Sequence, residues 1–412
     1  MSAGGTGLSR IAWRNLWRNR RRTGLALAAI GLSVALVLVY DSVLRWESDW
    51  LFETVTGPML GHVQVHAPDW RRTRAMDRTV RDVPSVMERL RRDPDVATAT
   101  PRIYAPALAA LGEEGFGVIV LGVDLAAEAR PSRLLAGASA RPAPGHILVG
   151  RLLAEQMGVR PGAQVALVGQ GIDGSLANDL FTVDALVTTP VDLVNRQGVV
   201  MWLEDAQLLF VMSGEAHEIV LYAHDAARAG ALAARLNGTA AIGGAEALDW
   251  RTLAPAIVDL IALVDVVWIF VLVLVLIAAA AGVANTMLMA TFERTHELGM
   301  LLALGLTPSR VVTMILLESL ALGIIGALIG TAVGSTLVAW AHHTGVDYAA
   351  LTGGGPSQLS FFGMNWSLRM YPRLTLVDIT RAVTAVMVTS LVASAWPAVR
   401  AARLQPARAL KA

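Results

Sequence analysis

The sequence predicts a multi-pass membrane protein with four transmembrane α-helices and a large α+β extracytoplasmic domain between the first and second helices. Hydrophobic residues make up 54% of the chain and charged residues only 16%, whereas ordinary soluble domains contain about 25% charged residues. Four apolar stretches approach or exceed the roughly 20 residues that cross a bilayer as a helix. Residues 46–255, by contrast, have the polarity of a soluble domain.

The four apolar stretches divide the chain into membrane and solvent segments. We expect membrane helices at residues 23–45, 256–290 (beginning with a stalk), 311–341 and 377–397. The other segments are a flank at 1–22, the large domain at 46–255, a short link at 291–310, a loop at 342–376 and a tail at 398–412.

Arginine placement orients these helices, because the short cytoplasmic flanks of membrane helices carry an excess of Lys and Arg. The flank 1–22, the link 291–310 and the tail 398–412 share one face of a four-helix topology, and all three are basic. Both termini and the link are therefore predicted to be cytoplasmic. The large domain and the loop 342–376 are predicted to lie on the other side of the membrane.

The flank 1–22 has two interpretations, which the residues leave open. Trp13 and Trp17 stand among arginines at helical spacing, as expected for a helix lying in the membrane interface. A basic flank with tryptophan anchors would have the same composition. The apolar run that follows is too long for a signal-peptide core, and no small-x-small site occurs at 41–50, so we expect an uncleaved anchor.

The composition excludes several kinds of function. The chain has no cysteine, which rules out disulfides, thiolate zinc sites and a cysteine nucleophile. Its only lysine is Lys411, so it has no Walker A loop, whose lysine must reach the nucleotide phosphates. The net charge of +1 gives no case for a nucleic-acid partner.

The large domain shows interspersed strand and helix patterns, which predict an α+β domain, here with two lobes. The proline-rich residues 141–145 are the expected lobe boundary. Expected strands are 62–65, 117–123, 164–168, 181–188, 199–203 and 218–223, and expected helices are 83–92, 151–157, 203–211 and 226–236.

Four short motifs have a chemical and a structural interpretation, and for each we favour the structural one. Residues 169–174 (GQGIDG) match the dinucleotide fingerprint, but no convincing helix follows, so a glycine-rich hairpin is expected. His62, Gln64 and His66 alternate with Asp69 nearby; the alternatives are a metal site and a solvated strand face. Asn237 begins a glycosylation sequon or a turn, and His342-His343 end a helix. We therefore expect no catalytic centre, no metal site and no enzymatic activity in this chain.

Two membrane features carry more information. A lone carboxylate such as Glu318 costs a few kcal/mol inside a membrane helix unless it is paired or faces protein. It would form a helix–helix hydrogen bond, lie close to the membrane surface, or serve a transport or proton role. Gly326, Gly330 and Gly334 recur every fourth residue, a spacing that lets a second helix pack closely.

The link 291–310 is predicted to form a short amphipathic helix on the cytoplasmic membrane face. Charged residues come first, an apolar run follows, and Pro308 ends it. Such a helix can seat in a groove on a soluble partner. Its candidate contact residues are Glu293, Arg294, Glu297, Gly299, Leu301, Leu304 and Gly305.

Several motifs together resemble permeases of the FtsX-like/MacB-type group of ABC transporters. They are ELGMLLALG at 297–305 followed by Pro308, LLESL at 316–320 followed by the spaced glycines, AWRNL at 12–16, and the ending from Trp396. Residues 61–66 (GHVQVH) are similar to the lipoprotein-releasing subgroup. Leu302 departs from the family, which usually has a basic residue there.

The resemblance implies mechanotransmission in a bacterial inner membrane. A separate ATPase homodimer would bind ATP and Mg²⁺ and seat the 291–310 coupling helix, beneath two identical or related permease chains. Its closure would move the membrane helices and rearrange the outer domains, which handle cargo. This chain would then need no cofactor of its own.

Three functional hypotheses follow. The first is release of lipoproteins from the inner membrane. The second is the same machinery exporting small molecules or peptides, or controlling a cell-wall hydrolase. The third, from another class, is a membrane-anchored sensor with an extracytoplasmic ligand domain, which would need a cytoplasmic signalling module.

Overall fold

The computed structural model describes residues 20–136, 141–347, 358–361, 364–367 and 369–404. The chain divides into two compact units. We call the first, built from the described parts of Met1–Ser48, Ala262–Gly353 and Arg369–Ala412, the helical unit. The second, mainly Asp49–Ile261, is the sheet domain. Most of the flank predicted as an interfacial helix lies outside the described residues.

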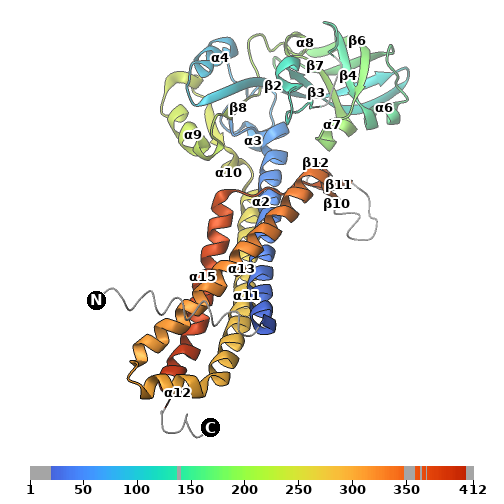
Figure 1. Cartoon of the computed structure of the whole chain (residues 1–412). Coiled ribbons are helices and arrows are strands. Elements are labelled where there is room, and N and C mark those ends of the chain that lie inside the picture. Colours follow the sequence, from blue (N-terminus) through green and yellow to red (C-terminus); the bar gives the residue numbers. More distant parts are fainter. Residues whose placement is uncertain (1–19, 137–140, 348–357, 362–363, 368, 405–412) are drawn as a thin grey trace. The chain divides into compact units, whose positions relative to one another are not determined.

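Four long helices dominate the helical unit and confirm the four predicted membrane helices (Figure 1). They are α2 (Arg20–Val55), α11 (Pro255–Glu293), α13 (Pro308–Thr344) and α15 (Leu376–Ala402), and the short α12 (Thr295–Ala303) joins α11 to α13. Each long helix is apolar and long enough to cross a membrane. The first extends past the predicted end at residue 45, since Leu51 and Val55, one turn apart, are both buried.

The spaced glycines of α13 face α2. A Cβ atom built on Gly326 would lie 2.6 Å from Cγ2 of Ile30, and one on Gly334 would lie 3.0 Å from Cα of Ala35. At Gly330 it would overlap the carbonyl oxygen of Gly31. Only glycine fits at such approaches, so the three residues form one stripe along which the two helix backbones meet.

The other side of α13 packs against α15. Gly323 leaves room for the side chain of Met387. The buried hydroxyl of Ser319 donates a hydrogen bond to the backbone carbonyl of Ser390, at 3.2 Å. Together with the glycine stripe, this contact makes α13 the central helix of the packing.

Nine strands of the sheet domain form one continuous sheet in the order β3-β7-β4-β6-β5-β2-β8-β1-β9. An extra antiparallel pairing between β2 and β3 closes six of them, β2, β3, β7, β4, β6 and β5, into a ring. The strands are β1 (Val63–His66), β2 (Val96–Leu111), β3 (Glu114–Val123), β4 (His146–Gly150), β5 (Gln164–Gln170), β6 (Leu176–Val187), β7 (Gly198–Trp202), β8 (Glu218–Ala223) and β9 (Glu246–Asp249).

The long strand β2 belongs to both parts of this sheet. Its first half pairs with β8, and its second half pairs with β3 and β5 inside the ring. The boundary predicted at residues 141–145 is therefore wrong, because the strands on either side of it, β3 and β4, both belong to the ring. The two parts of the sheet meet along β2 instead.

Short helices cover the sheet (Figure 1). The nine-residue α4 and α9 each bury four apolar residues, and α6 spans the residues predicted for it. The helices are α3 (Trp70–Thr73), α4 (Val83–Arg91), α5 (Leu125–Glu128), α6 (Arg151–Met157), α7 (Asp192–Gln197), α8 (Leu203–Leu209), α9 (Ala229–Asn237) and α10 (Trp250–Leu253), with single turns η1 (Thr56–Leu60), η2 (Ala226–Arg228) and η3 (Ala240–Ile242).

Short hairpin strands follow α13. They are β10 (Val346–Asp347), β11 (Gln358–Phe361), β12 (Met364–Ser367) and β13 (Arg369–Met370), and they pair as β10 with β13 and β11 with β12. The predicted 342–376 loop therefore contains strand structure in its described residues.

The glycine stripe generates a first prediction. Gly330→Leu should lower the thermal stability of the purified chain by at least a few degrees, because overpacking costs about 1–3 kcal/mol and the Gly31 carbonyl cannot move without shifting α2. Ala332→Leu, at an exposed position of the same helix, is the control and should melt like the parent in lipid nanodiscs. Equal melting of the Gly330 variant and the control would contradict close packing at the stripe.

Candidate functional site

The link between α11 and α13 is a helix closed by a glycine. The amide of Leu306 donates to the carbonyl of Leu301 at 3.0 Å, and that of Gly305 donates to the carbonyl of Leu302 at 3.1 Å. These two bonds form a Schellman motif, which needs a left-handed residue after the helix. Gly305 supplies it with φ +91°, so its position in the link has a structural reason.

The helix α12 has two different faces. Leu298 is buried, and with the partly buried Leu302 it belongs to an apolar cluster with residues of α13 and α15 (Val311, Met314, Ile315, Ala398 and Ala401). The opposite face is exposed: Met300 keeps 44% of its surface accessible and Leu304 keeps 79%, with His296 and Glu297 one turn before them. One side of α12 is thus fixed to the membrane helices, and the other is available to a partner.

The structure divides the predicted link residues between these faces. Glu293, Glu297, Leu304 and Gly305 are exposed, Leu301 is half-buried, and Arg294 and Gly299 are buried. Gly299 and Arg294, which were predicted to contact a partner, therefore pack against their own chain.

A buried ion pair ties the start of α12 to α13. Nη1 of Arg294 donates to both carboxylate oxygens of Glu318, at 3.1 and 3.3 Å. Arg294 is 6% exposed and Glu318 is 3% exposed. The sequence interpretation had treated these residues as two unrelated features, whereas they are partners across a sequence separation of 24 residues.

The geometry of this pair makes each residue depend on the other. Nε of Arg294 lies 4.0 Å from Glu297 on α12, and its buried Nη2 has no hydrogen-bond partner among the described residues. A buried guanidinium with an unsatisfied donor is costly, and losing its carboxylate would leave an uncompensated charge. Among the alternatives for Glu318, the structure favours a helix–helix hydrogen bond.

A second ion pair joins α2 to α15. Arg45 pairs with Asp378, whose side chain is fully buried. Asp378 also forms a capping box with Thr375 at the start of α15. Oδ2 of Asp378 accepts from the amide of Thr375 at 2.9 Å, and the Thr375 hydroxyl accepts from the amide of Asp378 at 3.3 Å. The acidic start of the fourth helix was visible in the sequence, but its partner 333 residues away was not.

In the sheet domain, buried Arg102 of β2 holds the turn that follows α2. Its Nε and Nη2 donate to the two carboxylate oxygens of Glu128 at 2.8 and 2.9 Å. Its Nη1 donates to the carbonyl of Met59 in η1 at 2.9 Å. The hydroxyl of Tyr222 donates to the carbonyl of Gly57, in the same turn, at 2.6 Å. The end of the α2 segment is therefore fixed to β2 and β8.

Two neighbouring polar groups complete this network. The hydroxyl of Tyr104 donates to Oε1 of Glu218 at 2.8 Å, and burial raises the pKa of Glu218. Nδ1 of His217 accepts from the amide of Tyr104, and its Nε2 lies 3.1 Å from the carbonyl of Met76. Burial lowers the pKa of His217 to about 4, so the imidazole stays neutral and can keep Nδ1 as an acceptor.

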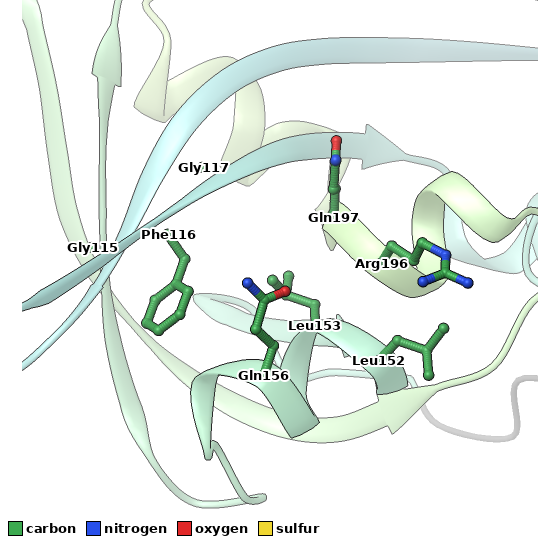
Figure 2. Close-up of a pocket in the computed structure, with 8 residues that line it drawn as sticks. All are labelled: Gly115, Phe116, Gly117, Leu152, Leu153, Gln156, Arg196 and Gln197. Carbon is green, nitrogen blue, oxygen red and sulfur yellow. The ribbon is translucent and has the colours of Figure 1, made fainter.

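A separate pocket of about 380 Å³ lies against the ring (Figure 2). Phe116 of β3 and Gln156 of α6 point toward its centre, whereas the guanidinium of Arg196 points away. Arg196 pairs with Asp192 on its own helix at 2.6 Å. With its one cation already paired, this pocket offers no clear chemistry for a charged ligand.

The motifs with a chemical interpretation are structural. Residues 169–174 end β5 and form the turn of the antiparallel β5–β6 hairpin, as expected. Gln64 and His66 are buried in β1 between β8 and β9, so the expected solvated strand face is wrong; the strand is interior to the sheet. The amide of Asn237 makes two hydrogen bonds to the backbone of Ala247. No cluster of three metal-binding side chains occurs among the described residues.

Known proteins are similar to this chain, some over its C-terminal third and some over most of its length. Residues 269–406 match the family FtsX-like permease C-terminal. The lipoprotein-releasing system transmembrane protein LolC of Neisseria meningitidis serogroup B is 25% identical over 405 residues, which cover 94% of each chain. LolC of Xylella fastidiosa (strain 9a5c) is 26% identical over 77% of this chain and 78% of its own.

Two other similarities are more limited. The ABC transporter permease YtrF of Bacillus subtilis is 47% identical over 62 residues, or 15% of this chain and 14% of its own. The periplasmic region of MacB from Actinobacillus actinomycetemcomitans aligns in structure with 47% of this chain and 91% of its own, at 11% identity and a TM-score of 0.34.

The membrane helices and the sequence matches to the FtsX-like family and to LolC define the class of protein: a permease of ABC transporters. Residues 269–406 are an FtsX-like permease domain, and the chain is homologous to LolC over nearly its whole length. The resemblance found in the sequence motifs is thereby confirmed. The domain includes α12 and the Arg294–Glu318 pair, so the candidate site lies within it.

The buried pair generates a second prediction. Glu318→Gln should lower stability by about 3–5 kcal/mol, because it leaves the buried Arg294 charge with only the half-exposed Glu297 carboxylate, at 4.0 Å. The double variant Arg294→Met with Glu318→Met should recover most of that loss, since apolar side chains of similar volume often replace a buried pair at little cost.

Thermal unfolding in nanodiscs measures both effects. Glu155→Gln, at an exposed carboxylate of α6, is the control and should change stability by less than about 1 kcal/mol. If Glu318→Gln melted like this control, the ion pair would not fix α12 to α13.

Proposed function

We propose that this chain is the membrane subunit of an ABC transporter that works by mechanotransmission. A separate ATPase homodimer binds ATP and Mg²⁺ and docks on the exposed face of α12. The observation that carries the proposal is the construction of α12: an exposed face on one side, and buried attachments to α13 and α15 on the other. Force applied to the exposed face of α12 has only the membrane helices to act on.

The long helices suit such transmission. The 36 residues of α2 and 39 residues of α11 run without interruption, which at 1.5 Å per residue gives lengths of about 54 and 58 Å. Hydrocarbon accounts for only about 30 Å of this length. Each helix is therefore longer than the hydrocarbon alone requires.

Orientation and partners complete the proposal. The basic flanks favour cytoplasmic termini and a cytoplasmic α12. The four helices would then cross the inner membrane, and the sheet domain would be extracytoplasmic. The apolar face of α11, including Val266, Phe270 and Ile277, is exposed in the single chain, and lipid or a second permease chain, identical or related, would cover it.

We further propose that the cargo is lipoprotein, released from the inner membrane. The full-length similarity to LolC supports this output, since those relatives are named for lipoprotein release. The second candidate is export of a small molecule or peptide, or control of a cell-wall hydrolase, by the same machinery. The local similarity to YtrF, a permease whose name specifies no lipoprotein, favours keeping it.

A third prediction tests the docking face. Met300→Asp combined with Leu304→Asp should abolish co-purification of the ABC ATPase and its stimulated ATP hydrolysis, because two carboxylates would be buried in an apolar contact. Leu208→Asp, at an 81% exposed leucine of the sheet domain, is the matched control and should retain the ATPase. An ATPase that stays bound to the double variant would overturn the role of α12.

A fourth prediction tests the cargo. Depleting the chain from its native cell should raise the amount of lipoprotein retained in the inner-membrane fraction several-fold, measured by acyl-labelling and membrane fractionation. Integral inner-membrane proteins without lipid anchors serve as the control and should not change. An unaltered lipoprotein distribution, with the ATPase still bound to the wild-type chain, would favour the second candidate.

A further inference from the structure

A pocket of about 410 Å³ lies inside the sheet domain, where β2 passes from one part of the sheet to the other. Its volume is within the range of small-molecule sites. Its apolar wall comes from five elements that are distant in sequence: Met59, Leu60, Trp70, Pro106, Ile119 and Leu193. A ligand that fills it must therefore have an apolar body.

The polar rim of the pocket carries an excess of positive charge. Arg71 and Arg74 both line it, and Glu218 is its acidic residue. No ion pair within 4 Å joins Glu218 to either arginine in the described chain; its nearest cation is Arg102, at 3.8 Å, which Glu128 already neutralises. Glu218 also accepts the hydroxyl of Tyr104. Glu218 attracts both rim guanidiniums at longer range, but one carboxylate cannot neutralise two cations, so the rim keeps a positive charge in excess.

Each rim arginine is positioned by its neighbours. Arg71 is half-buried and donates to Oε1 of Gln64 at 2.9 Å and to the carbonyl of Leu253 at 3.2 Å. The guanidinium of Arg74 lies 4.3 Å from the ring centre of buried Trp70. No carboxylate or other hydrogen-bond acceptor contacts the guanidinium of Arg74 among the described residues, and such a guanidinium presents planar donors suited to an oxyanion.

We propose that this pocket binds a small amphiphile with one oxyanion head, such as a carboxylate, and an apolar body. The head lies between Arg71 and Arg74, and the body lies against Trp70, Ile119 and Leu193. This site is independent of the proposed transport function, because it needs neither the ATPase nor lipoprotein.

Residues that line the pocket belong to the turn after α2 or are bonded to the segment just before α11. Met59 and Leu60 belong to the turn after α2, and Arg71 is bonded to Leu253, two residues before α11 begins at Pro255. Gln64 connects the two, since it accepts from Arg71 and donates to the carbonyl of Met59 at 3.3 Å. An occupant would therefore stabilise the ends of both helices.

The test uses three water-soluble probes with the same apolar body and different heads: 4-phenylbutyrate, 4-phenylbutanol and 4-phenylbutylamine. Each is titrated calorimetrically into the full-length chain in lipid nanodiscs, and binding to empty nanodiscs is subtracted. The carboxylate should bind saturably at one site per chain, and at least tenfold more tightly than the alcohol or the amine, because a charge-assisted pair with arginine is lost.

Two variants locate the site. Arg74→Gln should weaken the binding of 4-phenylbutyrate about tenfold, and Leu193→Trp, at a 42% exposed wall position, should block it. Arg72→Gln is the matched control: it neutralises the adjacent arginine of α3, which pairs with Asp69 and does not line the pocket. No saturable binding, equal binding of the three heads, or equal binding by the Arg74 and Arg72 variants would overturn the proposal.

Discussion

The buried contact between Arg294 and Glu318 constrains the whole helical unit. A guanidinium and a carboxylate withdrawn from water are tolerated only as partners, so neither α12 nor α13 can move alone without exposing a charge to an apolar environment. The apolar cluster below the pair adds α15 to the same assembly. The link therefore behaves as part of the membrane helices, although its composition is that of a surface segment.

The same physical solution recurs at two other joints. Arg45 and Asp378 connect α2 with α15, and Arg102 and Glu128 support the turn after α2. Between the two joints of the helical unit, the glycine stripe brings the backbones of α2 and α13 into contact without intervening side chains. Costly buried charges fix the ends of the helices, while close backbone packing restricts sliding along their length. Such a construction suits the proposed transmission of displacement, because it resists internal deformation.

Sequence alone was sufficient wherever one segment carried its own signal. The four membrane helices, the strand β8 and the helix α6 follow from local composition and periodicity. The strand β2 was not predicted, because its sequence is rich in alanine and contains Pro101 and Pro106, which argue against a central strand. The partner of Asp378 is 333 residues away, and no local pattern can reveal it. Gln64 and His66 suggested a wet surface because polar residues usually do, whereas β1 has neighbours on both edges.

The two faces of α12 explain why its exposed leucine and methionine are compatible with a stable protein. An apolar side chain left in water gains nothing for folding, and Leu304, which is 79% exposed, could be polar with little loss of buried area in its own chain. Leu298 and Gly299, in contrast, are buried in the packing of the same helix. A helix whose inner side satisfies the fold and whose outer side does not is best explained by a second surface that covers it. Since the inner side is joined to α13 through a charged pair, the proposed coupling would pass from the outer side to the membrane helices through this connection.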